Sequence, residues 1–172
     1  MRALVIYESM FGNTRAIAEA IGRGLARNMP ADVVEVGVAP DTVAEDVSIL
    51  VIGGPTHAFG MSRPSTRRSA AEQALGELVS QSRGMREWLA TASVPLTAAT
   101  AFDTRVGKPR LPGSAAKGAL RRLRRLGLGL AAPAESFYVG GTLGPLAEGE
   151  LARAQAWGEH LAVSVRSAAS RP

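Results

Sequence analysis

The sequence has no cysteine and only two histidines, His57 and His160. The lack of cysteine excludes disulfide scaffolds, thiolate zinc sites, cysteine-ligated iron–sulfur clusters and thiol nucleophiles. Two widely separated histidines are too few for a histidine-rich metal site. Long apolar runs are also missing: the strongest, such as residues 49–52, are far shorter than the about 18 residues that a membrane-spanning helix needs.

The first residues do not resemble an export signal, because the apolar run at residues 3–7 is short and no small-residue cleavage site follows it. We therefore expect a soluble, cytoplasmic protein. The chain has 172 residues, of which 46% are hydrophobic and 20% charged, which is typical of one globular domain spanning residues 1–172. Its net charge is +5, and nearly all of its cations are arginines. Such a charge suits acidic proteins, phosphates or nucleic acids, but does not choose among them.

Short apolar runs alternate with segments of helical spacing along the chain. Strands are predicted at residues 3–7, 33–38, 48–55, 94–102 and 136–139. Helices are predicted after each strand, among them a short one at 41–45 and amphipathic ones at 71–79, 85–92 and 114–126, with Ser114 as N-cap and Gly127 as C-terminal stop. Residues 56–69 are predicted as a loop. This alternation favours an α/β fold, a doubly wound, five-stranded parallel sheet covered by helices on both faces.

In such sheets ligands bind beyond the carboxyl ends of the strands, which points to the turns after the first, third and fourth strands. The first turn carries hydroxyls at Ser9 and Thr14, an amide at Asn13 and a glycine at Gly12, and a helix follows at once. Free amides at a helix start form an anion site without any cationic side chain. The alternative is a simple helix cap at Asn13 or Thr14. Neither GxGxxG nor GxxxxGK[ST] is present, which disfavours a dinucleotide fingerprint and a P-loop.

Residues 7–14, Tyr-Glu-Ser-Met-Phe-Gly-Asn-Thr, resemble the phosphate-binding loop of the flavodoxin family, which holds the 5′-phosphate of FMN. Residues 53–60, Gly-Gly-Pro-Thr-His-Ala-Phe-Gly, resemble the family's loop along the isoalloxazine ring, including the pattern of flavodoxin-like quinone reductases. Residues 102–105, Phe-Asp-Thr-Arg, stand where the family has its third flavin loop. The resemblance implies strand order 2-1-3-4-5 and bound FMN.

The resemblance also assigns roles to individual residues. The phosphate would be held by Ser9, Met10, Phe11, Gly12, Asn13 and Thr14. The N5 side of the ring would face Pro55, Thr56, His57, Ala58, Phe59 and Gly60. The other edge of the ring would be closed by Phe102, Asp103, Thr104 and Arg105. Because flavin is tuned by nearby hydrogen bonds and charge, no catalytic side chain is expected.

Two features depart from the family. Many flavodoxins stack the ring between tryptophan and tyrosine, whereas here only His57, Phe59 and Phe102 are aromatic in the candidate ring loops, which leaves room for a substrate on the ring. Carrier flavodoxins are typically acidic, whereas residues 103–125 contain a single acid, Asp103, and many cations. The cations of that segment are Arg105, Lys108, Arg110, Lys117, Arg121, Arg122, Arg124 and Arg125, and Arg63, Arg67 and Arg68 add to the preceding loop.

This charge favours docking to an acidic redox protein or to the phosphates of a nicotinamide nucleotide. The arginines of residues 121–125 are better explained as the solvent face of an amphipathic helix than as a nucleic-acid groove, since no aromatic residue is interleaved. Residues 61–84 are either a lid or docking segment beside the flavin, or a plain surface loop and helix.

The sequence therefore predicts an FMN-binding flavodoxin-like electron-transfer protein. One alternative is an FMN-dependent NAD(P)H:quinone-type oxidoreductase, which would take hydride from NAD(P)H and reduce a quinone-like acceptor. Another is a flavodoxin-fold binding or regulatory module that holds no flavin.

Overall fold

The computed structural model describes residues 1–109 and 111–169, so Arg110 of the predicted basic segment lies outside the described residues. The sheet consists of β1 (Arg2–Tyr7), β2 (Ala31–Glu35), β3 (Val47–Pro55), β4 (Ala98–Val106), β5 (Gly129–Leu130) and β6 (Glu135–Val139). Every pairing between these strands is parallel, in the order β2-β1-β3-β4. The fifth position is shared, because β5 pairs with the start of β4 and β6 with its end. The predicted order 2-1-3-4-5 is confirmed.

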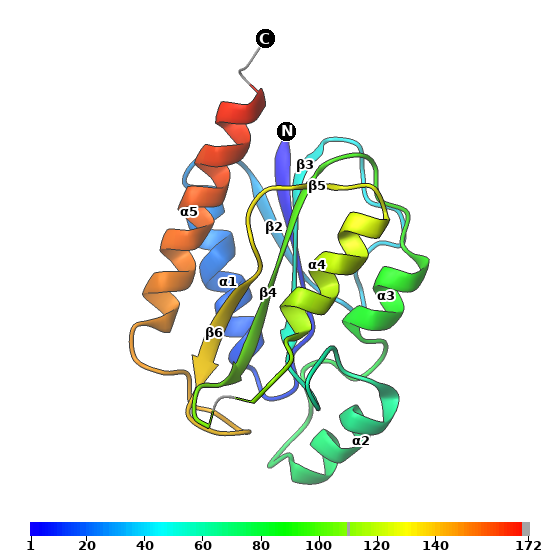
Figure 1. Ribbon diagram of the computed structural model, residues 1–172, viewed down its shortest axis with the longest axis vertical. Coiled ribbons are helices and arrows are strands. Elements are labelled where there is room, and N and C mark those ends of the chain that lie inside the picture. The colour runs from blue at the N-terminus through cyan, green and yellow to red at the C-terminus, as the bar shows by residue number, and fades with distance from the viewer. Residues whose placement is uncertain (110, 170–172) are drawn as a thin grey trace.

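The described residues contain five helices: α1 (Asn13–Ala26), α2 (Pro64–Gln73), α3 (Met85–Thr91), α4 (Ala115–Arg125) and α5 (Glu150–Ala169). α1 and α5 pack on one face of the sheet, α3 and α4 on the other, while α2 lies beyond the carboxyl ends of the strands (Figure 1). β3 contributes side chains to the hydrophobic cores on both faces of the sheet. Leu50 and Ile52 face α3 and α4, whereas Ile49 and Val51 face α1 and α5. Its continuous apolar run reflects burial on both faces.

Two predicted helices are wrong. Residues 41–45 form no helix. Instead Thr42 makes an isolated parallel bridge with Ser93, in which the amide of Val43 donates to the carbonyl of Ser93 and the amide of Ser93 to that of Asp41. The helix predicted at 71–79 is instead α2, which starts earlier with Pro64 at its first position and ends at Gln73. Leu75, expected on its apolar face, is 96% exposed. The predicted loop at 56–69 is correspondingly shorter.

The ends of two strands also differ from the prediction. β4 starts later than predicted and continues through the polar residues Asp103, Thr104 and Arg105, because it pairs with β3 on one side and β6 on the other. β2 ends at Glu35, after which Val36 donates to the carbonyl of Tyr7 and the chain turns.

The caps of α4 are as predicted. The Ser114 side chain accepts from the amide of Lys117, and Gly127 has a φ of 85°. In the described ranges no helix combines the length and apolar character needed to cross a bilayer.

Candidate functional site

A pocket lies at the carboxyl edge of the sheet, where the segments after β1, β3, β4 and β6 meet. It encloses about 120 Å³ and is open to solvent. Its lining consists of Ser9, Met10, Phe11, Asn13, Thr14, Pro55, Thr56, His57, Thr104, Arg105, Val106, Val139 and Thr142. No carboxylate is among these described residues, and Arg105 is their cation. The pocket therefore suits an anionic ligand electrostatically.

The start of α1 forms one wall of this pocket. Gly12 precedes the helix with a φ of 94°, a conformation that other residues adopt only with strain. The Ser9 hydroxyl is buried and accepts from the amides of Gly12, at 3.1 Å, and Arg15, at 3.3 Å. A hydroxyl has one proton and two acceptor sites, so the Ser9 proton stays available for an anion. The first turn of α1 contains no acidic residue.

The neighbouring hydroxyls and loops are held in place by further bonds. The Thr14 and Thr104 hydroxyls lie 2.6 Å apart and are buried, which joins α1 to the end of β4. The Asn13 amide donates to the carbonyl of Leu143 and so draws the loop after β6 onto α1. Gly144 allows this approach: it has a φ of 102°, and a Cβ there would lie 2.8 Å from the Asn13 amide.

A second hollow of about 170 Å³ adjoins the first and shares Thr56, Arg105 and Val106 with it. One wall is a tight turn in which His57 and Gly60 exchange backbone hydrogen bonds. The two central residues, Ala58 and Phe59, have φ values of 42° and 73°. Such a turn normally contains Asn or Gly, and other residues there cost about 1–2 kcal/mol each. The turn leaves the Phe59 side chain 57% exposed, facing Leu111 and Pro112 across the hollow.

Asp103 connects the turn after β3 to α4 from below the pocket. It is fully buried, and its Oδ2 accepts from the hydroxyls of Thr56 and Ser114 and from the amide of Ala116. The Thr56 hydroxyl in turn accepts from the amide of Ala115. A carboxylate at a helix start is stabilised by these amides and by the helix dipole. Asp103 therefore positions Thr56 and does not itself line the pocket.

Phe102 is not at the pocket, contrary to the resemblance-based prediction. It is fully buried on the α1–α5 side of the sheet, and its ring packs edge-on against Phe137, with 6.2 Å between centroids. The ring also lies over Gly53 of β3, where a Cβ would come within 2.1 Å of it. The missing side chain at Gly53 thus creates the space that Phe102 fills.

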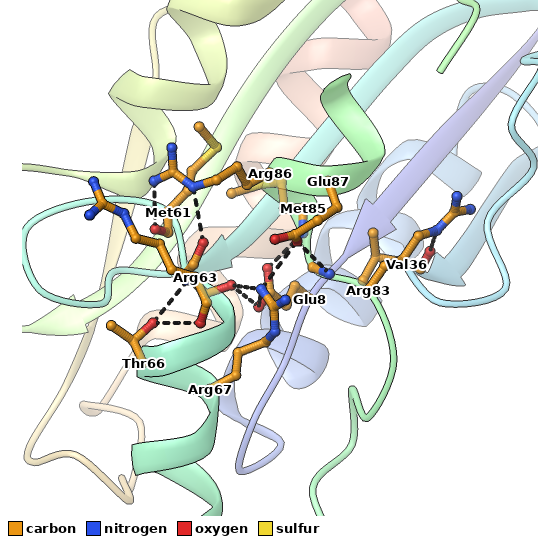
Figure 2. Close-up of polar contacts among 12 residues, drawn as sticks. Glu8, Val36, Met61, Arg63, Thr66, Arg67, Arg83, Met85, Arg86 and Glu87 are labelled. Atoms are coloured by element: carbon orange, nitrogen blue, oxygen red, sulfur yellow. Dashed lines mark hydrogen bonds and ion pairs between the residues drawn. The ribbon is translucent and has the colours of Figure 1, made fainter. Parts of the chain in front are cut away.

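A buried ionic cluster lies directly behind the first turn (Figure 2). Glu8 is fully buried and accepts from the Ser62 hydroxyl and, at 2.7 Å, from the amide of Met85. Arg67 donates to the Ser62 hydroxyl and to Glu87 and lies 4.0 Å from Glu8. Burial raises the pKa of the Glu8 carboxyl despite these bonds. Burial would by itself also raise the pKa of Glu87. The hydrogen bond from Arg67 and the positive charge of Arg67 outweigh it, so the pKa of Glu87 is lowered.

His57 contacts α2 beside this cluster. Its Nδ1 lies 3.3 Å from the Thr66 hydroxyl of α2. Burial, and then the nearby charge of Arg67, lower the pKa of His57. Its ring is therefore mainly neutral at pH 7 and can offer one nitrogen to a ligand in the pocket.

Residues 61–84, predicted as either a lid or docking segment or a plain surface loop and helix, are hydrogen-bonded to the turn after β1. Ser80 and Ser9 exchange two hydrogen bonds: the Ser80 amide donates to the Ser9 carbonyl, and the Ser9 amide to the Ser80 hydroxyl at 2.9 Å. The amide of Val79 donates to the carbonyl of Met10. With Ser62 and Met85 both bonded to Glu8, the segment supports the turn from behind.

Most predicted site residues thus meet in space. Ten of them line the main pocket, and Ala58 and Phe59 line the second hollow. Gly12 and Gly60 shape the turns, and Asp103 lies beneath. Sequence reasoning missed Val106, Val139 and Thr142. The glycines after the last strand could have indicated this loop as a part of the site, because the loop begins at the same edge of the sheet as the other site segments.

Comparison with known proteins agrees with this architecture. The flavodoxin family model matches residues 5–87, from β1 into α3. A flavodoxin from the domain Archaea is 20% identical, with a TM-score of 0.67, covering 96% of this chain and 99% of its own. Oxidised flavodoxin 1 from Bacillus cereus is 16% identical, with a TM-score of 0.68 and coverages of 94% and 97%. A WrbA-like flavodoxin from Agrobacterium tumefaciens is 18% identical, with a TM-score of 0.60 and coverages of 96% and 98%. No curated protein sequence matches the chain.

Proposed function

Because the flavodoxin family model matches residues 5–87 and the whole chain has the flavodoxin fold, we propose that this protein binds FMN non-covalently at the carboxyl edge of its sheet and transfers electrons to a protein partner. The observation that carries the proposal is the start of α1. There the amides of Asn13 and Thr14 bond to no other described residue and the Ser9 hydroxyl keeps its proton, beside a pocket whose described lining contains no carboxylate. These groups suit a phosphate, because the donors are already oriented and the helix dipole favours negative charge there.

The remaining parts of FMN have matching surroundings. The isoalloxazine ring would lie in the second hollow, between the 57–60 turn and Leu111. Thr56, held by Asp103, and the neutral His57 would offer polar groups to the ring. When bound, FMN supplies a centre that accepts and releases electrons, one or two at a time, and the chain tunes it through these hydrogen bonds.

A second candidate is an FMN-dependent oxidoreductase that takes hydride from NAD(P)H and reduces a quinone-like acceptor. The observation that favours it is a further hollow of about 360 Å³ beside the ring site, which is lined by Arg105, Lys117 and Tyr138. Two cations and an aromatic ring suit the phosphates and the ring of a nucleotide. In this case the two cations would bind the nucleotide phosphates and thereby orient the nucleotide beside the flavin.

Flavin titration tests the proposed site. We predict that Thr14→Val, which removes a buried hydroxyl at the start of α1, weakens FMN binding about tenfold or more, as expected for a lost hydrogen bond to a charged group. Riboflavin binding should change much less, because riboflavin has no phosphate. Thr100→Val is the matched control, since Thr100 is equally buried in β4 but bonds Ala132 away from the pocket.

The outcomes separate the candidates. Equal losses for FMN and riboflavin would contradict the phosphate assignment, and no flavin binding at all would favour a flavin-free module. For the loaded protein, a spectroelectrochemical titration gives the number of electrons at each midpoint. One-electron steps favour the carrier, and a single two-electron step favours the oxidoreductase.

A further inference from the structure

The positive charge of this protein is concentrated on one surface, which we name the basic face. It consists of Lys117, Arg121, Arg124 and Arg125 on α4, with Arg63 and Arg86 beside them. The four α4 residues are exposed, and α4 has no acidic residue. Within the described part of the chain, no ion pair joins any of these six residues to a carboxylate. Ion pairs instead involve Arg2, Arg15, Arg27, Arg67, Arg83 and Arg153.

The basic face is continuous across three elements. Met61 lies against Gly118 of α4, 3.6 Å from where a Cβ would stand, and Arg86 donates to the carbonyls of Met61 and Ser62. Arg63 and Arg86 extend to the same side, away from Glu8, whereas Arg67 turns inward (Figure 2). The five cations on α4 equal the net charge of the whole chain, so the remaining charges balance. An uncompensated charge of this kind attracts a partner of opposite sign.

The basic face adjoins the proposed flavin site. The amide of Ala115, the first residue of α4, donates to the Thr56 hydroxyl in the pocket wall. From there α4 runs along about 16 Å of surface. At its pocket end, the Phe59 and Leu111 side chains are 57% and 51% exposed across one hollow. An apolar spot beside a charged rim is the usual composition of a protein–protein interface.

We propose that the basic face, together with Phe59 and Leu111, docks an acidic redox protein, so that the partner's redox centre would lie beside the proposed flavin site. This rests on the proposed function for the flavin, but the docking surface itself is formed by the chain alone. The two exposed apolar side chains favour a protein over a nucleic acid, whose backbone would engage the arginines and leave Phe59 and Leu111 uncovered. The strained turn at residues 57–60 also supports a protein partner, because its backbone conformation keeps the Phe59 side chain exposed to solvent.

The test measures association with an acidic [2Fe–2S] ferredoxin as the probe and basic cytochrome c as the opposite-charge control. The rate with ferredoxin should fall steeply as salt rises from about 50 to 200 mM, while that with cytochrome c should not. Arg121→Gln/Arg125→Gln should slow ferredoxin association about tenfold. Arg121→Lys/Arg125→Lys, which keeps the charge, should restore it.

The matched control is Arg23→Gln/Arg27→Gln, which removes the same charge from an i, i+4 pair at the C-terminal end of α1, across the sheet, where Arg27 is the C-cap and pairs with Glu159. It should change the rate less than about twofold, because α1 packs on the opposite face of the sheet from α4 and salt screens charges on that side from a partner docked on the basic face. Equal slowing by both double variants would overturn the proposal, since net charge alone would then explain the attraction.

Two further measurements complete the design. Duplex DNA is tested in the same way. The proposal would be overturned in favour of nucleic acid if DNA bound in a manner that depends on salt and on Arg121 and Arg125 while ferredoxin did not bind. Association is measured with and without added FMN. Docking in a protein that takes up no FMN would leave the docking surface standing and refute the flavin function. FMN binding without docking would refute the surface alone.

Discussion

Ser80→Ala tests whether residues 61–84 support the turn after β1. The substitution removes the hydroxyl that accepts the Ser9 amide at 2.9 Å but leaves the Ser80 amide bonded to the Ser9 carbonyl. Ser9 and Ser80 are 0% and 2% exposed, so water has little access to the unpaired amide. A buried donor left without an acceptor costs about 1–3 kcal/mol. We expect the free energy of unfolding to fall by that amount.

Urea denaturation measures the loss, with an unchanged m-value showing that the native state stays compact. Ser69→Ala is the control, because Ser69 is exposed on α2 and its hydroxyl donates to the Ser65 carbonyl at a long 3.4 Å; it should change stability by less than about 0.5 kcal/mol. FMN affinity should also fall in Ser80→Ala, because the Ser9 hydroxyl, which we propose to bind the FMN phosphate, would be less well held. A Ser80→Ala protein as stable as Ser69→Ala would refute the support role.

Two further predictions concern the same edge of the sheet. Gly12→Ala should lower the free energy of unfolding by about 1–2 kcal/mol, because Gly12 has a φ of 94°. Gly129→Ala is the control and should cost less, because φ there is not positive and a Cβ would have no atom within 4 Å. Thermal unfolding compares the two variants, and equal losses would contradict the strain argument. Burial raises the pKa of Glu8 in the folded state, so the folded protein binds the proton more tightly than the unfolded chain, and stability should decline as pH rises from the ordinary value of 4.5 through the raised pKa. Glu8→Gln should lack this decline in urea titrations across pH 4–8, and identical slopes for the two proteins would show that Glu8 is not the group responsible.

The site could be predicted where its residues are neighbours in sequence. Ser9, Gly12 and Thr14 occupy one strand-to-helix turn, so their spacing alone places them at a helix start. Thr142 and Ser80 could not be found this way. They reach the turn only because the sheet order brings the loop after β6 to α1, and because residues 79–80 pair with residues 9–10.

The same contrast explains the errors in the fold. Residues 71–79 have helical spacing, yet the amides of Val79 and Ser80 bond to carbonyls of the first turn, and the helix ends at Gln73. Residues 103–105, beyond the predicted strand at 94–102, look like a loop because all three are polar. They form a strand because β4 has partners on both sides.

The sequence by itself determined the alternation of strands and helices, the α4 caps at Ser114 and Gly127, and the placement of Ser9, Gly12 and Thr14 at the start of a helix. Each of these depends on periodicity or on the backbone preferences of a few adjacent residues. Only the tertiary structure decided that Phe102 fills the space over Gly53, that Asp103 positions Thr56, and that Glu8 is buried against Ser62 and Met85. These depend on which residues distant in sequence face one another, and local propensity carries no information about that.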